Sequence, residues 1–176
     1  MKGEELDKII KDKMLLNEKI GSYENSRIIK KSAIDKEEVA GHIEKAEHNL
    51  NFIKDNLKLG YTDWCITGAY YAVYQASLAL LAARGYSSKN HDATLCILIR
   101  EYYNQGIDMQ DIYLINYFFL NYNDLLIYVN SKKKREDASY STKYKFDEKS
   151  VEEARINAIN FVNKSKDIVG GLLKAS

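Results

Sequence analysis

Hydrophobic residues recur at helical spacing along most of this chain. Between residues 36 and 59 they follow alternating steps of four and three, at Val39, Ile43, Ala46, Leu50, Ile53 and Leu57. Residues spaced in this way share one face of an α-helix, so the segment predicts an amphipathic helix with a buried face. Asp35 stands three residues before Glu38, which is the spacing of a capping box, and Gly60 marks the predicted end.

The following segment is apolar on nearly every face. It is predicted to begin at a Thr62 cap and to run to Arg84, and its apolar residues include Trp64, Ile66, Ala69, Tyr70, Val73, Tyr74, Leu78, Leu80 and Leu81. A helix without a polar face must be covered on all sides. We therefore expect it to be the central helix of a bundle, and we expect Gly85 to end it in the left-handed conformation.

The rest of the chain predicts helices at both ends. A weaker helix covers residues 3–19, and residues 20–34 read as a connector. A shorter helix spans residues 91–104, and a long one spans residues 108–134. Ser150 and Glu153 form a second capping-box pattern that opens a last helix, whose end is expected to fray at Gly170 and Gly171.

These segments predict an all-α fold. The chain contains no proline, and it has no sustained alternation of apolar and polar residues at a period of two. We expect an antiparallel bundle of four to five main helices plus the weaker N-terminal helix. Residues 1–34 would form an N-terminal helical extension and connector, and residues 35–176 the bundle domain.

Composition limits the binding partners and the cellular compartment that we expect for the protein. The net charge is +1 and the isoelectric point is about 7.7, so any binding of nucleic acid must use a local patch. Cys65 and Cys96 lie in apolar helical contexts and lack metal-ligand spacing, which predicts buried free thiols in a reducing compartment. No signal peptide and no apolar run near the ~20 residues of a membrane span are evident. We expect a cytoplasmic protein that uses no membrane, metal or cofactor.

Arg84 and His91 are the candidate catalytic residues. Six residues separate them, and they are expected at facing helix ends. An arginine can grip a phosphate while a histidine moves a proton, which would make a metal-free phosphodiester site. The alternative is structural: Arg84 caps the end of its helix, and His91 is a first-turn residue beside the Asn90 cap.

Two further groups could contact phosphate. The loop between the candidate pair offers Ser87, Ser88, Lys89 and Asn90. A basic run follows the long helix and comprises Lys132, Lys133, Lys134 and Arg135. The alternative for the basic run is a solvated helix end that the helix dipole favours.

Other residues are assigned structural roles. His42 and His48 lie six apart in one helix and share no face well, which disfavours a metal site. Tyr70, Tyr71 and Tyr74 fit the core and an interface better than a platform for stacking bases, although tyrosine suits both roles.

The chain resembles the HEPN domain family. The resemblance begins at KAEHNL (Lys45–Leu50), continues through Gly60–His91, and ends near REDASY (Arg135–Tyr140) and the last helix. It implies a fold of four or five helices and a homodimer. It also implies metal-independent endoribonuclease activity, since Arg84 and His91 match the family's pattern of arginine and histidine with four to six residues between. Some members are toxins paired with a nucleotidyltransferase antitoxin.

Two hypotheses for the function follow. In the first, the protein cleaves RNA through attack by the 2′-hydroxyl, with neutral His91 as base and Arg84 on the phosphate. One histidine and one arginine are few for this task, so a two-fold dimer would supply two copies of each at one cleft. In the second, the protein is a non-catalytic helical module that binds a nucleotide, an RNA or a partner protein. Gly85, which follows Arg84 where active members often carry a polar residue, favours the second.

Overall fold

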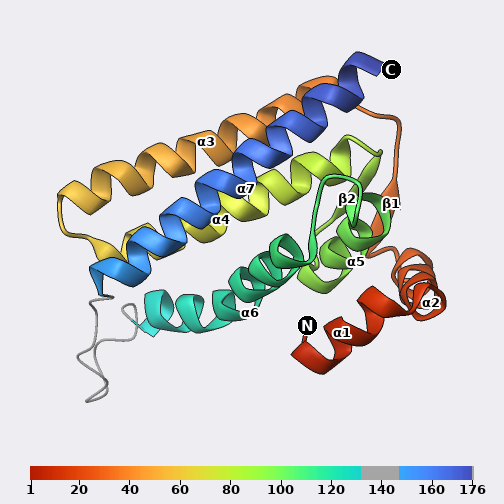
Figure 1. Cartoon of the computed structure of the whole chain (residues 1–176), viewed down its shortest axis with the longest axis horizontal. Coiled ribbons are helices and arrows are strands. Elements are labelled where there is room, and N and C mark those ends of the chain that lie inside the picture. The colour runs from red at the N-terminus through yellow and green to blue at the C-terminus, as the bar shows by residue number, and fades with distance from the viewer. Residues whose placement is uncertain (132–146, 176) are drawn as a thin grey trace.

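The computed structural model describes residues 1–131 and 147–175. Within these ranges the elements in chain order are α1 (Gly3–Lys11), α2 (Lys13–Asn25), β1 (Ile29–Lys31), α3 (Lys36–Lys58), α4 (Thr62–Ala82), β2 (Tyr86–Ser88), α5 (His91–Tyr102), α6 (Met109–Ser131) and α7 (Glu148–Ala175). The helices confirm the predicted all-α class (Figure 1). The short sheet was not predicted.

The central position of α4 confirms the prediction from its apolar faces. It packs against α3, α5, α6 and α7, and Figure 1 shows α3 and α7 lying along it. Tyr70, Val73 and Leu80 are all buried. Among the described helices, α4 is long and apolar enough to cross a membrane, but 67% of its apolar window is buried in the bundle, as in the core helix of a soluble protein.

The two cysteines are buried and free, as predicted. Cys65 lies on α4 and Cys96 on α5. Burial raises the pKa of the Cys96 thiol to about 12, so this group stays protonated at neutral pH.

Two predicted helix caps are present and two are not. The Asp35 carboxylate accepts from the backbone N–H groups of Glu37 and Glu38, and Asn90 Oδ1 accepts from Ala93 N–H. Thr62 is the first helical residue instead of a cap, because Tyr61 occupies the cap position of α4.

The last helix differs from its prediction at both ends. It opens at Glu148, and Asp147 accepts from the N–H of Ser150, which replaces the predicted Ser150 cap. The helix continues through Gly170 and Gly171 to Ala175, so the expected fraying is wrong. Helical hydrogen bonding is maintained because neither glycine has a conformation with positive φ.

The N-terminal extension has more structure than predicted. The predicted helix over residues 3–19 is two helices, because Asp12 interrupts it and caps α2 through the N–H groups of Met14 and Leu15. The predicted connector over residues 20–34 contains the end of α2 and all of β1. Leu6 and Ile20 belong to the common core, so the extension packs on the bundle.

The sheet joins the extension to the centre of the chain. β1 pairs antiparallel with β2, and the partners are Ile29 with Ser88, Lys30 with Ser87, and Lys31 with Tyr86. Gly85 has a φ of 71°, which confirms the predicted left-handed residue after α4. β2 then runs back beside α4, so that α5 begins near the middle of α4 and follows it in the same direction.

Candidate functional site

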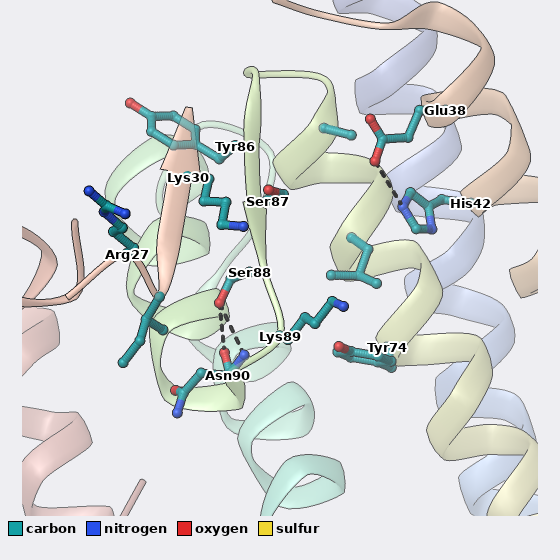
Figure 2. Close-up of a pocket in the computed structure, with 13 residues that line it drawn as sticks. Arg27, Lys30, Glu38, His42, Tyr74, Tyr86, Ser87, Ser88, Lys89 and Asn90 are labelled. Carbon is teal, nitrogen blue, oxygen red and sulfur yellow. Dashed lines mark hydrogen bonds and ion pairs between the residues drawn. The ribbon is translucent and has the colours of Figure 1, made fainter. Parts of the chain in front are cut away.

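The main candidate site is a groove between the two-stranded sheet and helices α3 and α4. Its cavity measures about 680 Å³, a size suited to a small ligand or part of a polymer. The lining residues are Arg27, Ile28, Lys30, Glu38, His42, Tyr74, Leu78, Ala82, Tyr86, Ser87, Ser88, Lys89 and Asn90. Figure 2 shows that β2 stands on one side of the groove, and Glu38, His42 and Tyr74 on the other.

Three basic side chains make the sheet side of the groove positively charged. Arg27 and Lys30 come from the extension, and Lys89 follows β2. In Figure 2 Lys89 extends toward α4, and Lys30 extends from β1 toward β2. Lys30 and Lys89 are exposed, and among the described residues none of the three cations is held in an ion pair. Three unpaired cations at one cavity can attract an anionic ligand.

The turn after β2 is ordered by its own hydrogen bonds. Ser88 Oγ donates to the carbonyl of Asn90 at 3.2 Å and accepts from its N–H at 3.1 Å. Asn90 in turn caps α5. These contacts fix Lys89 at the N-terminus of α5, where the helix dipole adds positive potential.

His42 and Glu38 form the polar part of the opposite wall. They are one turn apart on α3, and Glu38 Oε1 lies 3.9 Å from His42 Nε2. Gln75 Oε1 on α4 lies 2.8 Å from His42 Nδ1. The His42 side chain is 19% exposed, so it is held in place while still reaching the groove.

His91 lies beside the groove in an aromatic environment. Its ring stacks on Phe119 at 4.5 Å and meets the edge of Tyr74 at 5.2 Å between centroids. Its Nε2 lies 3.2 Å from the Tyr70 hydroxyl. Burial lowers the pKa of His91, because the imidazolium loses its water, so the ring is neutral at neutral pH.

The lowered pKa of His91 predicts acid sensitivity. The folded protein keeps the imidazole neutral, whereas the unfolded chain takes up a proton near its ordinary pKa of 6.5. The free energy of unfolding should therefore fall as pH drops below that value. Urea unfolding at neutral and mildly acidic pH measures this effect. The free energy of unfolding should depend less steeply on pH in His91→Gln than in wild type. The same dependence in both proteins would contradict this account of His91.

Arg84 lies at the other end of α5 from His91. Its guanidinium carbon is 5.7 Å from the ring centroid of Tyr102, and Tyr102 donates a hydrogen bond to the carbonyl of Leu80. Burial raises the pKa of Tyr102 to about 12. Since α5 has twelve residues, its two ends are about 17 Å apart. The expected placement of Arg84 and His91 at facing helix ends is therefore wrong within one chain, because β2 carries the chain back before α5 begins.

The structure separates the remaining predicted residues into two groups. Ser87, Ser88, Lys89 and Asn90 all line the groove. Lys132, Lys133, Lys134 and Arg135 lie outside the described residues. Within the described ranges no group of three His, Cys, Asp or Glu side chains is placed to hold a metal ion.

The sequence predicted the loop residues of the groove but not the lining residues that come from the extension and from α3. Arg27 and Lys30 were not singled out, Glu38 was noted only for its capping-box spacing, and His42 was considered only as a metal ligand. The available signals were weak: a basic cluster in a segment taken as a connector, and a glutamate four residues before a histidine on one helix. Neither pattern shows that these residues meet the loop after α4.

Comparison with models of known protein families finds a match. The model of the HEPN domain matches residues 39–168, which extend from α3 into α7. A search of the curated proteins finds no match to the chain. Arg27 and Lys30 precede the matched region, so this chain's own extension supplies two of the three cations of the groove.

Proposed function

The chain belongs to the HEPN domain family, and on this premise we propose that it binds RNA through phosphate contacts in the groove. The observation that carries the proposal is the set of three unpaired cations, Arg27, Lys30 and Lys89, around one cavity. The net charge of the chain is only +1, so this clustering is local and gives the groove an attraction that the whole protein lacks.

The other lining residues suit the remaining parts of a nucleotide. Ser87 is exposed and can hydrogen-bond a phosphate or a ribose hydroxyl. Ile28, Leu78 and Ala82 add apolar surface for a ribose or a base. The faces of Tyr86 are less suited to stacking, because Lys31 and Arg100 already lie over its ring.

Lysine removal tests the binding proposal. Lys30→Ala and Lys89→Ala should each weaken binding of a fluorescent single-stranded RNA by about tenfold at low salt, since each removes one phosphate contact. Each should also reduce the slope of log affinity against log salt by about one. Fluorescence anisotropy measures both quantities.

Lys149→Ala is the matched control. The Lys149 side chain is 87% exposed and lies at the start of α7, away from the groove. We expect it to change the affinity less than twofold, because Lys149 does not line the groove and its exposed ion pair with Glu153 contributes little. Equal losses in all three variants, or binding that does not respond to salt, would show that RNA does not use the groove.

Metal-independent RNA cleavage by Arg84 and His91 is a second candidate function. It is favoured by the lowered pKa of His91, since a general base must be neutral, and by the position of His91 directly after the groove loop. Within one chain Arg84 is too distant to assist, so this function requires a homodimer in which a second copy brings its own arginine. Light scattering and cleavage in EDTA test the two requirements.

The cellular role of the protein depends on whether it cleaves RNA. If the protein cleaves RNA in the cytoplasm, a nucleotidyltransferase antitoxin is the partner that its family resemblance implies. Co-expression of such a protein would then suppress the cleavage. If RNA is bound but never cleaved, the chain acts as a non-catalytic binding module.

A further inference from the structure

Glu38 places a negative charge in a groove that otherwise suits a polyanion. Its carboxylate lines the cavity from α3, across from β2 and from the turn that carries Lys89 (Figure 2). A carboxylate beside a phosphate weakens binding, because like charges repel each other. The arrangement instead suits a ligand whose phosphate meets the cations while an uncharged part with hydrogen-bond donors meets Glu38. In a nucleotide that uncharged part is the base.

We propose that the α3 side of the groove recognises a guanine base and that Glu38 is the specificity-determining residue. This inference rests on the proposed binding of RNA in the groove, and it names the base that the groove prefers. A carboxylate accepts two hydrogen bonds side by side, so its best partner offers two adjacent donors. Guanine offers them on its Watson–Crick edge, where N1–H and the N2 amino group are neighbours.

The other bases present a poorer edge to a carboxylate. Adenine and cytosine each have one amino group next to a ring nitrogen with a lone pair, and uracil has one N–H between two carbonyl oxygens. Each of them would place an acceptor against a carboxylate oxygen, which costs free energy instead of adding a bond. Proteins read single-stranded RNA through these edges because the bases are unstacked and accessible. Glu38 therefore selects guanine by attraction and rejects the other bases by repulsion.

His42 adds a third acceptor beside Glu38. Gln75 Oε1 lies 2.8 Å from His42 Nδ1, and an amide oxygen can only accept a hydrogen bond. Nδ1 of the neutral imidazole therefore donates, which leaves the lone pair on Nε2, 3.9 Å from Glu38 Oε1. The guanine amino group carries two hydrogens. When one of them bonds to Oε1 of Glu38, Nε2 of His42 is placed to accept the other.

The fold holds Glu38 in position without enclosing it. Its backbone N–H donates to the Asp35 carboxylate, which fixes the first turn of α3, and its side chain is 51% exposed. Ile28 and Leu78 line the same cavity and can cover the face of a base. Because water also reaches the carboxylate, we expect a preference of about tenfold for guanine over adenine, the lower end for a bidentate contact to a base.

A single guanine in a uridine oligomer tests the inference. Fluorescence anisotropy compares the binding of three single-stranded RNAs to the full-length protein, and these RNAs carry guanine, adenine or inosine at one central position. Wild type should bind the guanine RNA about tenfold more tightly than the adenine RNA. Inosine keeps the N1–H group but lacks the amino group, so its affinity should lie between the other two.

Glu38→Gln removes the carboxylate and keeps the size of the side chain. Its amide has one acceptor oxygen instead of two, so the ratio of guanine to adenine affinity should fall to about threefold or less. Glu37→Gln is the matched control, because Glu37 is exposed in the same turn of α3 but does not line the groove. Each variant loses one negative charge, so a general rise in RNA affinity cancels in the ratio.

The outcomes separate this inference from the proposed function. A guanine preference that Glu37→Gln retains and Glu38→Gln loses supports it. Equal affinity of wild type for guanine and adenine overturns it, as does inosine bound as tightly as guanine, or a preference that Glu38→Gln retains. In each of these cases RNA binding in the groove stands if Lys30→Ala and Lys89→Ala still weaken it. Absence of RNA binding by wild type, or binding that neither lysine affects, overturns the proposed function itself.

Discussion

Replacement of Gly85 by alanine is expected to lower the free energy of unfolding by about 3 kcal/mol or more. Two effects combine at this position. The φ of 71° is a conformation that costs an L-residue with a side chain about 1–2 kcal/mol. A Cβ at residue 85 would also lie 2.5 Å from the carbonyl oxygen of Ser32. That oxygen belongs to backbone whose N–H donates to the carbonyl of Gly85, so it cannot withdraw without breaking the contact.

Gly60→Ala separates these two effects. Gly60 has a similar φ of 77°, but a Cβ there meets no atom within 4 Å. Gly60→Ala should therefore carry only the conformational cost, about 1–2 kcal/mol. Urea unfolding of the two variants measures the difference. If the two variants lose the same free energy of unfolding, the close approach of the Ser32 carbonyl to residue 85 adds nothing to the cost of the alanine side chain.

Replacement of Gly68 by leucine should have an effect of similar size. A Cβ at this position in α4 would lie 2.7 Å from Ile53 Cγ1 and 3.2 Å from Phe52 Cδ1, both on α3. A larger side chain must push the two helices apart or force the α3 side chains into strained rotamers, at a cost of about 3 kcal/mol.

Gly41→Leu provides the comparison. Gly41 is also helical, on α3, and a Cβ there meets nothing within 4 Å. The same substitution should change the free energy of unfolding by less than about 1 kcal/mol, and the better helix propensity of leucine favours a gain. Thermal or urea unfolding measures both variants. A tolerated leucine at residue 68 would mean that the α3–α4 packing adjusts without cost.

The helices were predictable because their signals are local. The seam from Val39 to Leu57, the Asp35 cap and the left-handed Gly85 are patterns within a few residues of each other, and all three match the structure. The short strands were not predictable in this way. Ile29–Lys31 is stabilised by pairing with Tyr86–Ser88, a contact between distant segments that no local spacing records.

The candidate site was only partly predictable for the same reason. Ser87 and Lys89 were identified because they lie in the loop beside His91. His42 and Lys30 join them only through the packing of α3 and the pairing of β1. The separation of Arg84 from His91 depends on the direction of β2, which sequence spacing does not specify.

The anchoring of the N-terminal segment has a consequence for the order of folding during synthesis. β1 needs β2 as its partner, and Asn116 on α6 donates a hydrogen bond to the carbonyl of Met1. The N-terminal segment of this sequence therefore completes its contacts only after the chain through α6 has been synthesised. Until then the contact of Met1 with α6 is missing, whereas β1 can pair as soon as β2 has been synthesised. A nascent chain released before α6 would carry every residue that lines the groove but would lack the side chain that holds Met1.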